Sequence, residues 1–212
     1  MLSSHHYYNS SSLIRRIKRK LNLKLFNITN IVYRGNLEKN LNLMYLSSQI
    51  ENSILNTANQ PQMLTVTQNL GTKVIFFKSG KFHIMGKAIE QKPNQHDAHR
   101  QLSKYFSLLP CTLVKLLKHT KLECQTLTVS FSLGHTVNLV KLFNKLCEHY
   151  NGKFIGYCEL DSFPALMLRI WAPVHLNVFA SGHCILTGLK ENLYITLCTK
   201  IRKFLCKYIK QQ

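Results

Sequence analysis

The ten residues Phe77–Gly86, with the sequence FKSGKFHIMG, decide the fold, because their pattern recurs in the chain. The second copy is Phe179–Gly188, with the sequence FASGHCILTG, which lies 102 residues further along. Each copy reads as a strand ending in an aromatic residue, a Ser-Gly turn, and a second alternating strand closed by glycine. This pattern is typical of a β-hairpin, so the sequence predicts two similar hairpins.

The similarity between the two halves continues upstream of the hairpins, at an offset of 96 residues. The positions that correspond there are Asn30 and Thr126, Val32 and Thr128, Leu37 and Leu133, Leu41 and Val137, Leu43 and Leu139, and Leu46 and Leu142. A pattern that repeats at a fixed offset indicates a repeated structural unit. The sequence therefore predicts two copies in one chain, related by a pseudo-twofold axis.

These patterns divide the chain into a leader, two repeats and a linker. Residues 27–109 form the first repeat, which ends in a helix expected over Gln95–Leu108, and residues 122–212 form the second. Between them we expect a linker over residues 110–121, around Pro110. The last helix of the second repeat carries an apolar stripe at helical spacing, made of Leu193, Leu197, Ile201, Phe204 and Tyr208.

Residues 1–26 form a basic leader that we expect to be flexible. It is rich in Ser and Asn and runs into the basic stretch Arg15–Lys20, with the sequence RRIKRK. Such a stretch is typical of a nuclear-import signal or of an arm that binds nucleic acid. A solvated tail without a partner is the alternative.

Strand alternation assigns two faces to the predicted sheet. In Lys73–Phe77, the side chains of Val74 and Phe76 point away from those of Ile75 and Phe77. The chain supplies enough helix to cover only one face. The fold class is therefore α+β, and the uncovered face is where we expect function to reside.

The net charge points to a polyanionic partner. The chain has 28 Lys and Arg against 9 Asp and Glu, a formal charge of +19. Nucleic acid fits this balance better than an anionic membrane does. The sequence has no uninterrupted apolar run of about 18 residues and no apolar signal-peptide core. Its 7 cysteines lack the C-x-x-C spacing that would indicate zinc or redox chemistry.

Signs of catalysis are weak in the sequence. His96 and His99 share one face of a predicted helix with Asp97 between them, but no further ligand set accompanies them. There is neither a phosphate-binding glycine-rich loop nor a G-x-S-x-G motif. We therefore expect no enzyme activity, no metal and no cofactor.

One stretch of the second repeat resembles a known family. The residues Phe163–Pro173, FPALMLRIWAP, fit the pattern F-P-x-L-x-x-R-x-x-x-P of the TATA-binding-protein family. The hairpin after them is similar to that family's F-x-S-G-K-x-x-x-T-G, and Asn30–Val32 resembles its opening N-I-V strand. The resemblance, which covers residues 27–210, implies a two-repeat saddle: a curved antiparallel sheet with helices on its convex face. It also implies that the concave face binds A/T-rich DNA through the minor groove.

The resemblance implies phenylalanine wedges that enter base steps and kink the duplex. Phe163 and Phe179 hold these positions in the second repeat, and Phe77 and Gln60 hold them in the first. Gln60 departs from the aromatic pattern, and Met63 nearby is a substitute if the register shifts. Core packing of these phenylalanines is the alternative.

The resemblance also implies contacts with the floor of the groove. Asn30 holds the position of an asparagine that donates to adenine N3 and thymine O2, and Thr126 stands where its symmetric partner would be. Val32, Ile185 and Thr187 match small contacts that exclude the guanine amino group. Floor residues that depart from the family pattern are Thr128, His83, Met85 and Asn177.

Two further sets of residues follow from the resemblance. Arg169, Lys81 and Lys190 match phosphate contacts, while His183 replaces a lysine. Glu159 and Asp161 resemble the acidic loop that the family offers to transcription factor B. A helix cap or a solvated turn is the alternative for this acidic pair.

The function that this predicts is a TATA-binding-protein-like initiation factor, which binds and bends A/T-rich promoter DNA and recruits a transcription factor B-like protein and RNA polymerase. We expect it in the nucleus, or in the host nucleus if the source is a virus. The first alternative keeps the saddle as a protein-interaction platform or a nonspecific DNA-binding subunit. Another is an RNA-binding sheet that uses Phe77 and Phe179 for stacking. The fold also occurs as a non-catalytic domain of DNA glycosylases and ribonucleases H, but a catalytic domain is missing from the sequence.

Overall fold

The computed structural model describes residues 25–58, 61–67, 72–87 and 94–209. The first half of the described chain contains β1 (Asn27–Asn36), α2 (Leu43–Gln49), β2 (Ser53–Asn56), β3 (Met63–Thr67), β4 (Lys73–Phe77), β5 (Lys81–Gly86), α3 (Gln95–Ser103) and α4 (Cys111–His119). The second half contains β6 (Glu123–Ser132), α5 (Leu139–His149), β7 (Gly156–Tyr157), β8 (Ala165–Leu168), β9 (His175–Phe179), β10 (His183–Leu189) and α6 (Tyr194–Ile209).

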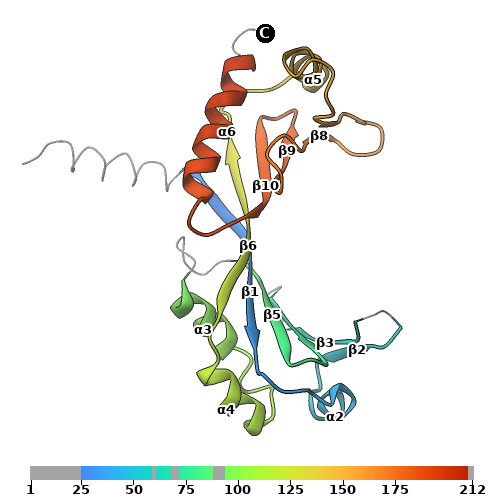
Figure 1. The fold of residues 1–212 in the computed structure, drawn as a ribbon, viewed down its shortest axis with the longest axis vertical. Coiled ribbons are helices and arrows are strands. Elements are labelled where there is room, and N and C mark those ends of the chain that lie inside the picture. Colours follow the sequence, from blue (N-terminus) through green and yellow to red (C-terminus); the bar gives the residue numbers. More distant parts are fainter. Residues whose placement is uncertain (1–24, 59–60, 68–71, 88–93, 210–212) are drawn as a thin grey trace, which may run out of the picture.

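All ten strands form one antiparallel sheet in the order β2-β3-β4-β5-β1-β6-β10-β9-β8-β7. The long strands β1 and β6 lie side by side at its centre, so the order is the same from either end once the repeats are exchanged. Helices α3, α4 and α6 lie along one side of the sheet, and α2 and α5 lie near its two ends (Figure 1). The predicted α+β saddle of two pseudo-symmetric repeats is confirmed.

Alternation along the strands separates a core layer from a partly exposed layer. Strands β4 and β9 have the same burial pattern, in which Val74 and Phe76 correspond to Leu176 and Val178 and are fully buried. The residues between them are half-buried or exposed. The sheet therefore packs on helices through one face only, as the sequence predicts.

The repeated Ser-Gly turn has a specific structural reason. Gly80 and Gly182 both adopt φ = +81°, a left-handed conformation that favours glycine. A Cβ at Gly80 would overlap the carbonyl oxygen of Lys39, and one at Gly182 would overlap that of His135. The connection from the central strand to the first helix thus crosses the hairpin tip in both repeats, and only glycine admits it.

The first helix of each repeat begins in the same way. The side chain of Asn42 accepts a 3.0 Å hydrogen bond from the backbone N–H of Tyr45 at the start of α2. Asn138 caps α5 by accepting an equal bond from Lys141. Such caps satisfy donors that have no partner within the helix.

The predicted helix over Gln95–Leu108 is wrong at its C-terminal end, and the predicted linker contains a helix. α3 ends at Ser103, and α4 begins at Cys111, immediately after Pro110. Proline has no N–H and disfavours helical geometry in the residue before it, so it separates α3 from α4. It is also well suited to start a helix. Leu113 and Leu117 of α4 then pack into the core.

The predicted apolar stripe of α6 is confirmed at Ile201 and Tyr208, and its other buried residues are each one position after a predicted one. The buried residues are Tyr194, Cys198, Ile201, Leu205, Tyr208 and Ile209, whereas Leu193 is 57% exposed. Both stripes have helical spacing, so periodicity alone does not choose between them.

The buried face of α3 contains a polar cluster. Tyr33 donates a 2.6 Å hydrogen bond to Asp97, and the Gln101 amide donates to the same oxygen at 2.9 Å. Burial, with the Asp97 hydrogen bond second, raises the pKa of Tyr33. Asp97 is therefore a core residue and does not join His96 at the surface.

The leader lies outside the described residues except for its last two positions. Phe26 is buried, with the centroid of its ring 5.5 Å from that of Phe131. No described helix is long and apolar enough to cross a membrane. Within the same residues, no three His, Cys, Asp or Glu side chains are grouped so as to hold a metal ion.

Candidate nucleic-acid interface

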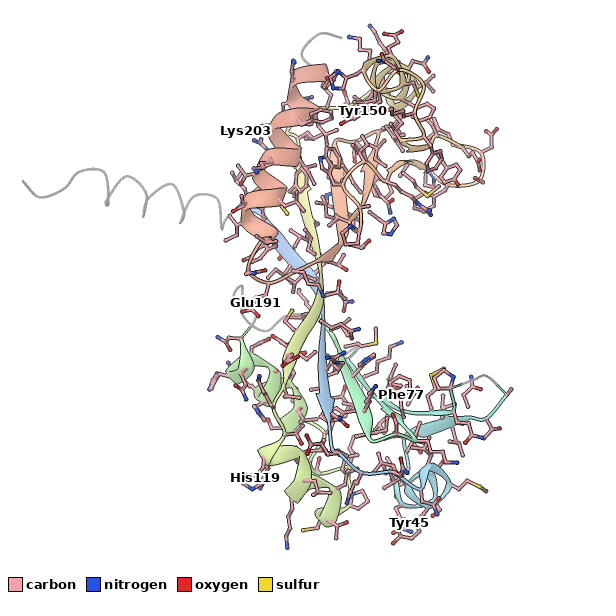
Figure 2. All side chains as sticks on the ribbon, viewed as in Figure 1. Tyr45, Phe77, His119, Tyr150, Glu191 and Lys203 are labelled. Carbon is pink, nitrogen blue, oxygen red and sulfur yellow. The ribbon has the colours of Figure 1, made fainter. Side chains whose placement is uncertain are left out.

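The partly exposed layer of the sheet forms a continuous surface, here called the concave face. Phe77 lies on it, on the side of the sheet away from α3 and α4, whereas Lys203 lies on the outer side of α6 (Figure 2). Strand alternation and register give its members as Asn30, Val32, Thr65, Ile75, Phe77, His83, Met85, Thr126, Thr128, Met167, Asn177, Phe179, Ile185 and Thr187.

The register of β1 and β6 brings the predicted central residues together. Asn30 lies opposite Thr128, and Val32 lies opposite Thr126. Val32 is only 7% exposed, while Asn30 is half-buried. The Thr126 hydroxyl oxygen is buried and has no hydrogen-bond partner among the described residues, so Asn30 is the more accessible polar group at this centre.

The second repeat brings two predicted wedge residues into contact. The ring centroids of Phe163 and Phe179 lie 6.2 Å apart with an interplanar angle of 60°, an edge-to-face arrangement. Ala165 lies opposite Phe179 in the adjacent strand. Phe163 is held in its turn by a 3.0 Å hydrogen bond from its N–H to the carbonyl oxygen of Glu159.

The first repeat surrounds its phenylalanine differently. Met63 lies opposite Phe77, and the His83 ring contacts Phe77 edge-on at a centroid distance of 5.2 Å. Burial, and to a lesser degree the charge of Arg34, lowers the pKa of His83 below 6.5, which favours a neutral ring. Gln60 lies outside the described residues.

Ile185 and Thr187 lie on β10, opposite Asn177 and His175 of β9. Both are half-buried and share the concave face with Thr128. The predicted floor of the second repeat is therefore contiguous.

The predicted phosphate contacts are exposed and lie at separate places on the saddle. Lys81 begins β5, and Lys190 follows β10, where its ammonium group donates a 3.1 Å hydrogen bond to the carbonyl oxygen of Gln125. The Arg169 guanidinium lies 5.6 Å from the centroid of the Tyr157 ring. This stacking restricts the arginine without removing its charge.

The acidic pair lies in the turn between β7 and β8. Glu159 and Asp161 are exposed, and the turn leads directly into Phe163. Beside it lie exposed apolar residues that sequence reasoning missed, with Phe154 at 64% and Leu160 at 41% exposure. Nothing in a single sequence distinguishes such residues from core positions.

One pair of facing residues on the central strands is charged in the first repeat and uncharged in the second. Glu123 lies opposite Arg34 and accepts ion pairs from Arg34 at 3.7 Å and from Lys121 at 3.3 Å. The positions that correspond at an offset of 96 to Arg34 and Glu123 are Ser130 and Asn27, which also lie opposite one another and are uncharged. Sequence reasoning also missed Thr65 and Met167 on the floor, although the alternation of β3 and β8 could have found them.

The comparisons with known proteins agree with this geometry. A family model described as transcription factor TFIID, or TATA-binding protein (TBP), matches residues 25–105. The chain is 26% identical over 173 residues to the TATA-box-binding protein of Methanococcus aeolicus, covering 80% of this chain and 88% of that one. It is 26% identical over 182 residues to the TATA-box-binding protein of Thermoplasma acidophilum, covering 85% and 94%.

A solved structure has the same fold. Methanococcus jannaschii TBP superposes with a TM-score of 0.64 at 22% identity, covering 88% of this chain and 99% of that one. The sequence matches and the shared fold extend over both repeats. In sequence and in fold, the chain is therefore similar to TATA-binding proteins.

Proposed function

We propose that this chain is a transcription initiation factor that binds A/T-rich promoter DNA in the minor groove and bends it. The observation that carries the proposal is the pair of rings of Phe163 and Phe179, in contact at 6.2 Å at one end of a partly exposed sheet face. Relatives named TATA-box-binding proteins support it. The proposal treats residues 27–109 and 122–212 as the two repeats of the saddle, and gives the chain no catalytic role.

Recognition of A·T pairs would depend on the centre of the concave face. The minor groove of an A·T pair presents only acceptors, whereas a G·C pair adds the guanine amino donor. The Asn30 amide can donate to those acceptors. Val32, Ile185 and Thr187 offer alkyl surface that leaves a guanine amino group without a partner, which costs about 1–3 kcal/mol for a buried donor.

Bending would come from the aromatic residues at the ends of the face. Inserting a side chain between base pairs costs a few kcal/mol per step, and the wider contact of the bent duplex with the protein offsets this cost. Phe163 and Phe179 would enter one step. Lys81, Arg169 and Lys190 would hold the backbone by contacts that carry no sequence information.

The test is a fluorescence-transfer bending assay on end-labelled duplexes at about 150 mM salt, where nonspecific charge binding is weakened. We expect an A/T-rich duplex to bend and a G/C-rich duplex of equal length not to bend. Equal, salt-sensitive binding of both without a bend would contradict the proposal. That result would favour the second candidate, a nonspecific DNA-binding or interaction platform, for which Asn177 on the floor and the buried Thr126 hydroxyl are the supporting observations.

The proposal includes a transcription factor B-like partner that docks at the loop containing Glu159 and Asp161 and links the complex to RNA polymerase in the nucleus. Both carboxylates are exposed beside apolar surface, as a partner site requires. The double variant Glu159→Lys, Asp161→Lys should abolish binding of such a partner to the DNA complex. Unchanged recruitment, measured by gel shift with intact DNA binding, would remove the loop from the proposal.

A further inference from the structure

The strands of the two repeats are in the same register, so their concave faces can be compared position by position. Met63 opposite Phe77 corresponds to Ala165 opposite Phe179. The further pairs at the same offset of 102 are Thr65 and Met167, Ile75 and Asn177, His83 and Ile185, and Met85 and Thr187. The backbone is therefore shared, and any functional difference between the ends comes from side chains.

At the end of the second repeat, the side chain opposite Phe179 is small and a second aromatic ring lies beside Phe179. Ala165 has no atom beyond Cβ, and the centroid of the Phe163 ring lies 6.2 Å from that of Phe179. Both phenylalanines remain half-buried rather than enclosed in the core. Two adjoining rings form a wide apolar edge that can enter a base step.

At the end of the first repeat, the corresponding position holds a larger side chain. Met63 stands where the second repeat has Ala165. On the other side of Phe77, the His83 ring, which lies opposite Ile75, contacts the Phe77 ring edge-on. The strand register makes Pro61 the counterpart of Phe163, whereas the family resemblance assigns Gln60 to that position; neither residue has an aromatic ring that could pair with Phe77. A histidine ring contacts the phenylalanine in both repeats, His83 at 5.2 Å from Phe77 and His183 at 6.2 Å from Phe179, so the repeats differ in the missing second phenylalanine and in the thioether opposite Phe77.

The border of the first repeat also differs from that of the second. Glu123 is 54% exposed and forms ion pairs with Arg34 and Lys121. The three groups together keep a net positive charge, which attracts phosphate without requiring that a base step be entered. The corresponding positions in the second repeat, Ser130 and Asn27, carry no charge.

We propose that the two ends of this saddle act differently on DNA. It unstacks a single base step, beneath Phe163 and Phe179, while the first repeat contacts the groove without entering a step. This inference rests on the proposed function and specifies its ligand. The ligand is an A/T-rich duplex with one easily unstacked pyrimidine–purine step at the end that the second repeat covers. No such step is required beneath the first repeat, since pyrimidine–purine steps lower only the cost of kinking.

The test uses four duplexes of equal length with an A/T-rich core of eight base pairs. Three of them have this core, with a TA step at both of its ends, at one end or at neither end. The fourth is a G/C-rich control, in which the A/T-rich core is replaced. Affinity is measured by anisotropy, and unstacking by 2-aminopurine fluorescence at each end. We expect the one-step duplex to bind within about threefold of the two-step duplex, and the duplex without a step to bind at least about tenfold more weakly.

Two variants sharpen the result. Phe163→Ala should abolish the 2-aminopurine signal of the one-step duplex, whereas Phe77→Leu should leave it unchanged. The double variant Pro61→Phe, Met63→Ala should create a second ring pair. The variant should then bind the two-step duplex about tenfold more tightly than the one-step duplex. Circular dichroism of each variant confirms that it is folded.

The outcomes separate the inference from the proposed function. If the unmodified protein binds the two-step duplex more than about tenfold better than the one-step duplex, with full unstacking at both ends, the inference is overturned and the proposed function stands. If it fails to prefer any A/T-rich duplex over the G/C-rich one, the proposed function is overturned, and the inference with it.

Discussion

The hairpin β4–β5 and the hairpin β9–β10 have the same backbone, turn and register, but their two faces have diverged to different degrees. On the buried face every position stays apolar in both copies. These pairs are Val74 and Leu176, Phe76 and Val178, Phe82 and Cys184, and Ile84 and Leu186. On the concave face, the pairs that change chemical type are Ile75 and Asn177, His83 and Ile185, and Met85 and Thr187.

The difference separates what the fold requires from what the ligand requires. Buried positions are constrained by close packing, in which a polar group without a partner is costly. The concave face has no such constraint, so its two ends can specialise. A chain with two identical halves would fit a symmetric ligand, and this one has an aromatic pair at one end and a charged border at the other.

The largest expected effect comes from removing the aromatic pair. Phe163→Ala combined with Phe179→Ala should abolish DNA bending and lower affinity for an A/T-rich duplex by about a hundredfold, because no ring remains to offset the unstacking cost. Fluorescence transfer measures the bend. The control is Phe154→Ala, which removes an exposed ring that packs on Tyr157 instead. Bending that persists in the double variant would refute the assignment of these residues as wedges.

The hairpin turns should respond alike, because here the two repeats do not differ. Gly80→Ala and Gly182→Ala should each destabilise the fold by about 2–3 kcal/mol, since a Cβ in this left-handed conformation meets a carbonyl oxygen. Gly134 is a matched control, with φ = +88° but open space around the added atom. Gly134→Ala should cost only about 1 kcal/mol, the penalty of the left-handed conformation. Urea denaturation measures all three, and equal losses at Gly80 and Gly134 would contradict the proposed steric cause.

The parts of the structure that sequence reasoning predicted are those with local causes. The Ser-Gly turns, the strand faces and the repeat follow from alternation and from the need for glycine at Gly80 and Gly182. Helix α4 was missed because Pro110 was interpreted as part of a linker, although proline starts helices as well as ending them. The predicted stripe of α6 was right at Ile201 and Tyr208 and one residue early elsewhere, because two apolar series lie one residue apart and only tertiary packing decides between them.

The candidate site was less predictable, because it depends on which side chains meet across strands. The wedge residues Phe163 and Phe179 came from the family resemblance, and their contact is visible only in the structure. Neither the packing of His83 on Phe77 nor the buried hydroxyl of Thr126 has a signal in one sequence. Both result from register, which composition and periodicity leave open.

A smaller effect is expected at the centre of the saddle, where Asn30 and Thr126 hold corresponding positions in the two repeats. Asn30→Val should reduce the preference for A/T-rich over G/C-rich DNA by about tenfold, because it removes a donor to minor-groove acceptors. Thr126→Asn should increase that preference by supplying a second amide next to the first. Competition gel shifts measure both. If neither variant changes the ratio of the two affinities, the central residues do not read the base pairs.

The smallest effect concerns His83, whose counterpart in the second repeat is Ile185. Burial, with the Arg34 charge second, lowers the pKa of His83 below its ordinary value of 6.5. The folded protein therefore binds fewer protons than the unfolded chain as pH falls below 6.5, so this contribution to stability is present above that pH and is lost towards the lowered pKa. His83→Ile should flatten the fall in stability between neutral and mildly acidic pH, and should leave the first repeat with a floor residue like that of the second.

The measurement is the urea concentration at the unfolding midpoint, at neutral and at mildly acidic pH, for the unmodified protein and for the variant. The shift in midpoint between the two pH values is then compared between the two proteins. His99, whose pKa is also lowered by burial, is unchanged in both proteins and cancels. His175→Ile is the control, because that histidine is exposed at the other end of the sheet. An equal pH dependence in the unmodified protein and His83→Ile would mean that the imidazole is solvated in solution. The 5.2 Å contact of His83 with Phe77 would then not persist in solution, and this difference between the two ends of the saddle would be lost.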